Sequence, residues 1–281
     1  MLKRFGSFYK TVEGNEGCKC RYPTRLDTYG CGCAHDCKYC YAKSLLSFRN
    51  LWNPKEPEVA SIQYITNAIR KIPKGQVVRL GGMTDCFQPI EKVRRNTYRT
   101  IQKLNHAGIG YLIVTKSAMV ADDEYLEILD KNLAHIQITV TSTDDKLSAT
   151  YEKASPPSER IKAIEKLQAL GFDVAIRLSP FIPEYLNFNI INKIKCDKAV
   201  VEFLRANAFI KKTFDIDYSR YTINQGNYCH LPLGDKLKLI QQVKLKEVTV
   251  CEDEDNAYKY WRDHFNPNPL DCCNLRMEST R

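Results

Sequence analysis

The sequence predicts an α/β protein whose parallel strands close into a partial barrel. Short apolar runs rich in β-branched residues recur along the chain, and amphipathic helical patterns separate them. Strand, helix and strand in regular alternation form βαβ units, which build a parallel sheet. A first strand leading into a cysteine-rich loop adds a sixth unit. The other strand-like runs are residues 77–80, 111–115, 136–141, 174–178 and 199–203.

The helices between these strands are predicted from apolar residues at three- and four-residue spacing. Residues 62–72 carry isoleucine at that spacing, and residues 161–170 carry isoleucine and leucine. Gly171 follows the second series as a candidate C-terminal cap, because glycine readily adopts the left-handed conformation found there. Asp122 or Asp123 could cap a third helix from its N-terminal end.

The alternating pattern ends near residue 205, and the remaining chain is rich in Tyr, Asn, Lys and Asp. One helical stretch is predicted near residues 236–243. We therefore divide the chain into an N-terminal extension (1–24), a barrel core (25–205) and a cysteine-containing C-terminal extension (206–281). The last part is expected to wrap the open side of the barrel or to cover its mouth.

Composition limits where the protein acts and what it binds. No apolar run approaches the roughly 20 residues that span a bilayer, and the N-terminus does not resemble a signal peptide. We expect a cytoplasmic protein without a membrane partner. Its 12 cysteines are then unlikely to form disulfides and favour metal binding instead. The net charge of +9 fits a nucleic-acid partner as well as a solvated basic surface.

Cys33, Cys37 and Cys40 are the most informative residues, with spacing Cx3Cx2C. Three thiolates on one loop can hold three corners of a [4Fe–4S] cluster and leave the fourth iron open. A zinc site is an alternative, but it usually needs a second short knuckle. A plain redox cluster is another, but a ferredoxin-type loop needs a fourth cysteine, usually followed by proline. We favour the open cluster.

This cysteine spacing resembles the signature of the radical S-adenosylmethionine (SAM) superfamily. The resemblance implies a [4Fe–4S] cluster whose open iron takes the amino and carboxylate groups of SAM. It also implies a TIM-like partial (β/α)6 barrel with its chemistry at the C-terminal ends of the strands. An electron donor of the flavodoxin or ferredoxin type would reduce the cluster.

Ordered motifs after the strands resemble the spore photoproduct lyase-like branch of this superfamily. The resemblance covers about residues 25–205. The motifs are Thr84-Asp85-x-Phe87-Gln88-Pro89-x-Glu91, Thr115-Lys116-Ser117, and residues 151–160 and 178–183.

Four residues, in the cysteine loop and after the strand at residues 77–80, are assigned to cofactor binding. Gly81 and Gly82 permit close approach of the backbone to a ligand. The resemblance implies a hydrogen bond from this segment to the amino group of SAM, whereas an ordinary tight turn is the alternative. Tyr39, beside the last cysteine, and Thr84 complete this group.

Three polar residues at or near later strand ends are further candidates. Lys116 is expected to contact the SAM carboxylate as a point charge, with a surface lysine as the alternative. Ser142 could supply a hydroxyl to the ribose or carboxylate. Arg177 is costly inside a barrel unless it is paired. It is expected to face the cofactor or substrate, or to form a structural ion pair with an acidic residue such as Glu202.

The remaining cysteines suggest two further roles. Cys86 could return a hydrogen atom to a product radical, as the resemblance implies for a cysteine near the barrel mouth, although buried free cysteines are common. The others could bind a second iron–sulfur cluster or a zinc ion, or could remain unligated. These thiols are Cys18, Cys20, Cys31, Cys251, Cys272 and Cys273.

The resemblance implies an enzyme that cleaves SAM reductively to a 5′-deoxyadenosyl radical, which abstracts hydrogen from a substrate. Its branch and the positive charge favour a nucleic-acid base or nucleotide, in DNA lesion repair or base modification. One alternative is a peptide or small molecule, with an auxiliary cluster. Another, of a different class, is a non-enzymatic iron–sulfur or zinc protein that binds nucleic acid.

Overall fold

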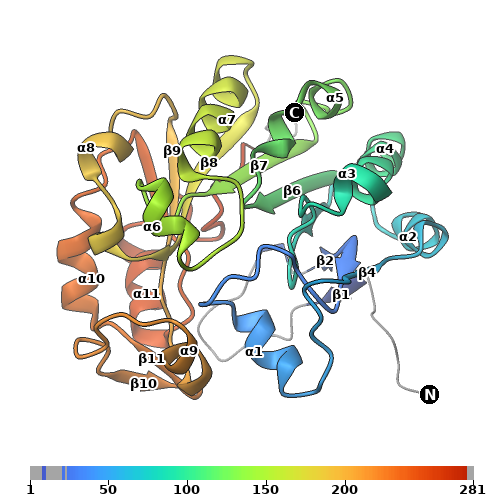
Figure 1. The fold of residues 1–281 in the computed structure, drawn as a ribbon. Coiled ribbons are helices and arrows are strands. Elements are labelled where there is room, and N and C mark those ends of the chain that lie inside the picture. The colour runs from blue at the N-terminus through green and yellow to red at the C-terminus, as the bar shows by residue number, and fades with distance from the viewer. Residues whose placement is uncertain (1–7, 11–20, 23, 277–281) are drawn as a thin grey trace.

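The structure is a computed structural model that describes residues 8–10, 21–22 and 24–276. Its centre is an eight-stranded sheet in the order β1-β2-β5-β6-β7-β8-β9-β12 (Figure 1). The strands are β1 (Phe8–Lys10), β2 (Thr24–Leu26), β5 (Val77–Leu80), β6 (Gly110–Thr115), β7 (Ala134–Thr139), β8 (Asp173–Phe181), β9 (Lys198–Phe203) and β12 (Glu247–Val250).

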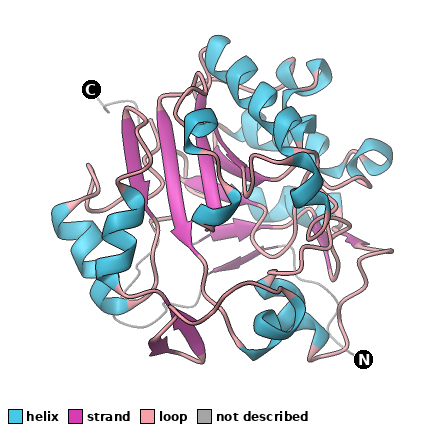
Figure 2. Ribbon diagram, turned by 60° about the vertical axis from the view of Figure 1, so that its left-hand side comes forward, coloured by secondary structure: helices cyan, strands magenta, loops and turns pink. Residues whose placement is uncertain are grey.

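Within this sheet β1 pairs antiparallel with β2, and the other strands pair in parallel. Figure 2 shows the strands in magenta with the helices around them. The α/β class, the partial barrel and the five recurring strands are thereby confirmed. The structure adds β12, a parallel strand from the region beyond residue 205. Its sequence, Glu-Val-Thr-Val, is half polar and too short to stand out as an apolar run.

Helices surround the outside of the curved sheet (Figure 1). Gly171, at φ +81°, follows α7 as predicted. Asp122 precedes α5, but its side chain makes no capping hydrogen bond. The helices are α1 (Tyr41–Ser47), α2 (Ile62–Ile69), α3 (Glu91–Arg94), α4 (Asn96–Ala107), α5 (Asp123–Leu126), α6 (Asp145–Ala149), α7 (Pro157–Ala169), α8 (Phe188–Ile191), α9 (Ala208–Thr213), α10 (Leu233–Ile240) and α11 (Asp255–His264).

Short elements complete the fold. Two 3₁₀ helices, η1 (Ala118–Ala121) and η2 (Pro183–Tyr185), follow β6 and β8, and two small antiparallel sheets join β3 (Tyr29–Gly30) to β4 (Glu58–Val59) and β10 (Ile223–Gln225) to β11 (Tyr228–His230). Among the helices of the described ranges, none has both the length and the apolar character needed to cross a bilayer.

The two faces of the sheet differ in chemistry because successive side chains on a strand point to opposite sides. On β7, Ile136 and Ile138 belong to the main hydrophobic core. Their neighbours Gln137 and Thr139 are also buried, but they are polar. Arg177 of β8 pairs in register with Thr139 and lies on the same inner face. The inside of the barrel is therefore lined by polar and charged groups.

The segment after residue 270 crosses this inner face at the N-terminal ends of the strands. Lys198, the first residue of β9, donates from Nζ to the carbonyl of Asn274 at 2.7 Å. The backbone N–H of Arg276 donates to Asp173, the first residue of β8, at 2.7 Å. The region beyond residue 205 therefore contributes a closing segment at the end of the barrel opposite to its mouth. At the mouth it contributes α9 and the β10–β11 hairpin, which lie near α1 (Figure 1).

Candidate metal and cofactor site

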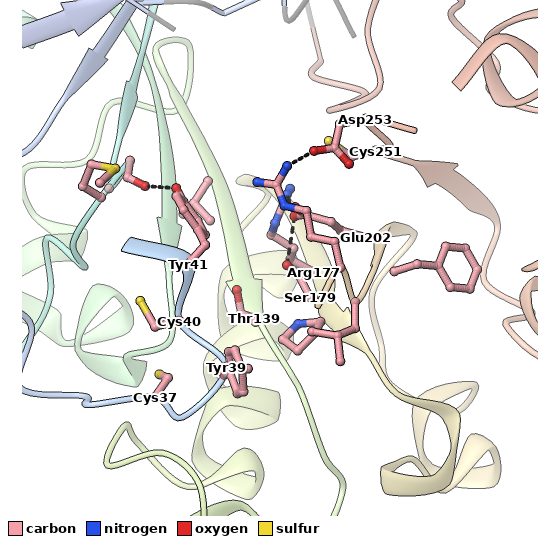
Figure 3. A pocket seen from close by; sticks show the side chains of 18 of the residues that line it. Cys37, Tyr39, Cys40, Tyr41, Thr139, Arg177, Ser179, Glu202, Cys251 and Asp253 are labelled. Atoms are coloured by element: carbon pink, nitrogen blue, oxygen red, sulfur yellow. Dashed lines mark hydrogen bonds and ion pairs between the residues drawn. The ribbon is translucent and has the colours of Figure 1, made fainter. Parts of the chain in front are cut away.

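A cavity of about 650 Å³ lies inside the barrel and is lined by the loops that follow the parallel strands. Figure 3 shows Cys37, Tyr39 and Cys40 on one side of it, and Arg177, Glu202 and Cys251 on the other. Most of the residues predicted for the site line this cavity. They are Cys33, Cys37, Tyr39, Cys40, Gly81, Gly82, Thr84, Lys116 and Arg177.

Two turns shape the loop that carries the three predicted metal ligands. The N–H of Asp36 donates to the carbonyl of Cys33 at 3.1 Å, and the N–H of Cys40 donates to that of Cys37 at 3.2 Å. The loop is also tied to the segment after α6, because the N–H of Lys38 donates to the carbonyl of Tyr151 at 2.9 Å. The three thiols are thus held on one wall of the cavity before any ligand arrives.

The chemistry of these thiols fits a metal cluster. Cys33 and Cys37 are buried and Cys40 is half-buried, and none of the three forms a disulfide. Burial raises the pKa of the Cys33 thiol to about 12, and it raises the pKa of Cys37 well above the ordinary value. Such thiols stay neutral alone, but coordination to a metal ion deprotonates them. The donor set therefore suits the [4Fe–4S] cluster expected from the spacing.

A buried ion pair supports the loop that carries the three cysteines. Glu152 and Arg160 have fully buried side chains and pair directly. Glu152 also accepts hydrogen bonds from the hydroxyls of Tyr39 and, at 3.0 Å, Thr141. Although burial raises the pKa of Glu152, the facing Arg160 guanidinium brings it below the ordinary value. Residues 151–160 were recognisable from the sequence as a motif, and the two opposite charges eight residues apart were the available signal for this pair, which was not predicted.

Asp85 links the cysteine loop to the end of β6. It accepts from the N–H of Lys116 at 2.6 Å and from the hydroxyl of Thr115 at 2.7 Å. Its other neighbour is His35, with Nε2 at 3.3 Å from Oδ2. Burial opposes ionisation, but the charge and hydrogen bond of His35, together with the other donors, lower the pKa of Asp85 to about 2.

The glycine pair has a clear steric requirement. Gly81 has φ +80°, and a Cβ there would lie 2.7 Å from the carbonyl oxygen of Val114. The N–H of Gly82 donates to Asp27 at 2.7 Å, and its carbonyl accepts from the Tyr41 hydroxyl. Thr84 donates from its hydroxyl to the carbonyl of Tyr29 at 2.5 Å. These bonds fix the loop closely against the cavity.

The two predicted cations differ in their partners. The Lys116 ammonium lies 5.5 Å from the centre of the Tyr39 ring, and the described residues provide no ion pair for it. Arg177 pairs with Glu202 and donates to Gln137 at 2.8 Å. The structure therefore shows the structural ion pair considered for Arg177, and it leaves Lys116 as the available cation.

Ser142 and Cys86 were predicted for the site but do not line the cavity. Ser142 is buried and donates from its hydroxyl to the carbonyl of Tyr185 at 3.0 Å, and it does not line the cavity. Cys86 has no exposed surface, packs in the main core and is likewise absent from the cavity wall. A hydrogen-atom donor must touch its substrate, so this placement gives no support to the predicted role of Cys86.

Arg205 and the region beyond it complete the far wall with residues that were not among the predicted site residues. Arg205 pairs with Asp253, and its guanidinium lies 5.5 Å from the ring of Tyr41 and 5.2 Å from that of Tyr228. Arg205 comes two residues after β9, so its position at a strand end was the available signal. Asp253 had no such signal, because the strand before it was not predicted.

Three of the remaining cysteines gather on this far wall. Cys251, Cys272 and Cys273 all line the cavity. The neighbouring Cys272 thiol lowers the pKa of Cys251 to about 7. Cys31 does not line the cavity, and Cys18 and Cys20 lie outside the described residues.

Comparison with known protein families gives one match. A model of the radical SAM superfamily matches residues 28–186. This span includes the cysteine loop, the glycine pair and Lys116, and it ends shortly after β8.

Two curated proteins resemble part of the chain. One is an uncharacterised protein of Acidianus two-tailed virus (ORF301), 25% identical over 55% of this chain and 55% of its own length. The other is an uncharacterised protein of Methanocaldococcus jannaschii (MJ0683), 28% identical over 57% of this chain and 61% of its own. The chain thus spans just over half of the length of each of these relatives.

Solved structures share the fold. A spore photoproduct lyase mutant with bound SAM and dinucleoside spore photoproduct superposes with a TM-score of 0.61 at 16% identity, over 83% of this chain and 77% of that one. Methylornithine synthase superposes with a TM-score of 0.55 at 13% identity, over 91% of this chain and 74% of that one. At these identities the likeness establishes the fold alone.

Proposed function

The chain belongs to the radical SAM superfamily, and we propose that it is an enzyme that holds a [4Fe–4S] cluster on Cys33, Cys37 and Cys40 and cleaves SAM reductively. The observation that carries the proposal is the wall formed by these three thiols together with Lys116, a cation without an ion pair among the described residues. A zinc knuckle requires only its four ligands and no cation beside them.

The residues of the near wall have distinct tasks in this proposal. The three thiolates hold three irons, and Glu152 with Arg160 keeps the loop that carries them in place. Lys116 binds the SAM carboxylate by a charge-assisted hydrogen bond. The loop at Gly81 and Gly82 lines the cavity and would lie against the ligand, in a path that Gly81 permits by its positive φ and its close approach to Val114. When bound, the cluster supplies the electron that splits SAM into methionine and a 5′-deoxyadenosyl radical, the agent of hydrogen abstraction.

For the substrate we propose a nucleic-acid base or nucleotide, in lesion repair or base modification. Arg25, Arg79, Arg177 and Arg205 all line the cavity, and phosphate groups favour arginine. The solved spore photoproduct lyase with a similar fold binds a dinucleoside photoproduct. A cavity of about 650 Å³ is too small for a duplex, so a base in DNA would have to be extruded into it.

A peptide or small molecule is the second candidate, favoured by one observation. Cys251, Cys272 and Cys273 line the same cavity, so that an additional metal centre there would lie close to the substrate. In either case we propose an electron donor of the flavodoxin or ferredoxin type and a reducing cytoplasmic setting, in which these thiols stay reduced.

The test is formation of 5′-deoxyadenosine by the anaerobically reconstituted protein with SAM and dithionite. We expect product from the wild type and from Cys229→Ala, a thiol that does not line the cavity, but none from Cys37→Ala. Stimulation by DNA or RNA would support the nucleic-acid proposal. Absence of product from protein with a full [4Fe–4S] cluster would refute SAM cleavage and leave a non-enzymatic metal protein.

A further inference from the structure

Two neighbouring strands each present an arginine to the cavity, and SAM cleavage as proposed uses neither of them. Arg25 of β2 and Arg79 of β5 lie opposite each other in the parallel register, and both line the cavity. Neighbouring strands are only about 4.8 Å apart, so two guanidinium groups on the same face repel each other. An anion bound between them would remove this repulsion.

Arg79 has hydrogen-bonding capacity that the protein does not use. Its Nε is buried and has no hydrogen-bond partner within the part of the chain that the structure describes. The described residues also give its guanidinium no ion pair. A buried donor without an acceptor is destabilising. The planar fork of an arginine matches the oxygens of a phosphate, which would therefore supply the missing acceptors.

The carboxylate that faces Arg79 is Glu202, and it is already engaged. Glu202 pairs with Arg177, and it accepts from the hydroxyl of Ser179 at 2.9 Å. Although burial raises its pKa, three arginines bring it down to about 2: Arg177, Arg205 and Arg79. One carboxylate thus serves three guanidinium groups, and it does not offset the charge of all of them.

The other carboxylates on the described wall of the cavity are engaged as well. Asp253 pairs with Arg205, and Glu252 pairs with Lys236. Asp85 accepts the hydrogen bonds at the end of β6 that are described above. Among the described residues, the cavity therefore keeps more cationic than anionic groups, and a bound anion would restore the balance.

The arginine pair lies toward the closed end of the cavity. Leu112, which is in register with Arg79 on β6, belongs to one hydrophobic cluster with Tyr22 and Cys273. Cys273 is part of the closing segment and also lines the cavity. Lys116 comes directly after β6, four residues and roughly 13 Å further along from Leu112. An anion at the arginine pair would therefore be distinct from the SAM carboxylate at Lys116.

From these contacts we propose that Arg25 and Arg79 bind a terminal phosphate group of the substrate, a role that rests on the proposed function of this cavity. The substrate is then a small phosphomonoester, in the class of nucleoside monophosphates, and not a base extruded from a nucleic-acid strand. A phosphomonoester carries nearly two negative charges at neutral pH, which two guanidinium groups balance.

The shape of the cavity supports a terminal phosphate over an internal one. A phosphate within a strand continues in two directions, and the closing segment stands in the way of one of them. Ligand pockets of roughly 300–1,000 Å³ hold one drug-sized molecule. A cavity of about 650 Å³ that also takes SAM therefore leaves room only for a small substrate.

The first experiment measures binding of inorganic phosphate by calorimetry, in the full chain loaded with the cluster and SAM. We expect one bound phosphate per chain. Arg79→Met should weaken its binding roughly 10- to 100-fold, because charge-assisted hydrogen bonds are lost, and should bind SAM like the wild type. Arg70→Met, at the exposed C-terminal end of α2, is the matched control and should bind phosphate normally.

Two results of this experiment would overturn the proposal. One is a folded wild type that binds no phosphate, or an Arg79→Met variant that binds it with wild-type affinity. The other is a loss of SAM binding in Arg79→Met as large as the loss of phosphate binding, because the arginine would then belong to the SAM site.

A titration of the chain without cluster or SAM separates this proposal from SAM cleavage. The sheet builds the arginine pair, so phosphate binding that depends on Arg79 should persist there, and it should persist in Lys116→Met. If no SAM is cleaved but this binding remains, only the proposed enzyme activity fails. If SAM is cleaved and this binding is missing, only the phosphate subsite fails.

Competition tests whether the phosphate must be terminal. Ribose 5-phosphate carries a terminal monoester and should displace inorganic phosphate from the wild type. Thymidylyl-thymidine, whose single phosphate is an internal diester, should not displace it. Displacement by this dinucleoside, or none by ribose 5-phosphate, would overturn the assignment of a small phosphomonoester substrate.

Discussion

The two walls of the cavity are built on different principles. On the near wall, the supporting residues pair with one another, whereas three thiols and the Lys116 ammonium, which has no ion pair among the described residues, face the cavity. On the far wall, two of the cations that face the cavity are already paired, Arg177 with Glu202 and Arg205 with Asp253. The difference indicates that the near wall is shaped for a cofactor. The far wall instead presents paired charges, in fixed positions, to a molecule that enters the cavity.

Removing the support of the near wall should have the largest effect. Arg160→Met leaves Glu152 charged and buried without its partner, which typically costs about 3–5 kcal/mol of stability. We expect this loss in chemical denaturation, with reduced iron loading. The double variant Arg160→Met/Glu152→Gln should recover part of the stability, because no unpaired charge remains. Equal losses in the single and double variants would show that the ion pair does not organise this wall.

The next largest effect should appear in SAM binding. Lys116→Met removes a charge-assisted hydrogen bond worth about 1.5–3 kcal/mol, so the Kd for SAM should rise roughly 10- to 100-fold. Lys103→Met, on the exposed face of α4, is the control and should bind like the wild type. Calorimetry with the loaded cluster measures both. Unchanged binding by Lys116→Met would remove the distinction drawn between the two walls.

A pH effect of about 2 kcal/mol is expected from Asp85. Its pKa is about 2 in the folded protein and 3.8 ordinarily, so its contribution is present above about pH 4. The contribution is lost as pH falls toward 2, and a shift of nearly two pKa units corresponds to about 2 kcal/mol. Denaturation of the wild type and Asp85→Asn between pH 6 and pH 2 tests this. Parallel curves for the two proteins would contradict it.

The smallest predicted effect is a difference in unfolding free energy between a glycine replaced at the cavity wall and one replaced at the free surface. Gly75 and Gly81 both have φ +80°, but a Cβ on Gly75 meets nothing within 4 Å. Alanine should therefore cost about 1 kcal/mol of backbone strain at either position. Gly81→Ala should cost about 1–2 kcal/mol more, because its Cβ clashes with the Val114 carbonyl oxygen. Similar unfolding free energies for the two variants would show that this approach can relax.

The sequence predicted the near wall better than the far wall, for physical reasons. Buried parallel strands appear in the sequence as apolar runs, and the residues that bind ligands come directly after them. The cysteine loop, the glycine pair and Lys116 could therefore be assigned to the site from the sequence. Cys86 belongs to the same loop as Gly81, yet its side chain turns into the core. Side-chain direction in an irregular loop depends on packing that spacing does not reveal.

The far wall depends on contacts between distant parts of the chain. Nothing in the sequence indicates that Cys251 would meet Cys272, because the segment between them includes a helix whose direction is set by tertiary packing. Nor did β12 stand out, since half of its residues are polar. The division at residue 205 predicted that the later chain would wrap or cover the barrel, but it gave no sign that this chain would also supply a strand of the sheet.

The closing segment has a consequence for how the molecule is assembled. The hydroxyl of Tyr22 donates to Asp271 at 2.8 Å, across 249 positions of the chain. Chains are synthesised from the N-terminus, and contacts of such long range form late because closing a large loop is entropically costly. The polar inner face of the sheet therefore stays exposed to water until residues 271–276 have left the ribosome. Until then we expect the end of the barrel opposite to its mouth to stay open to solvent.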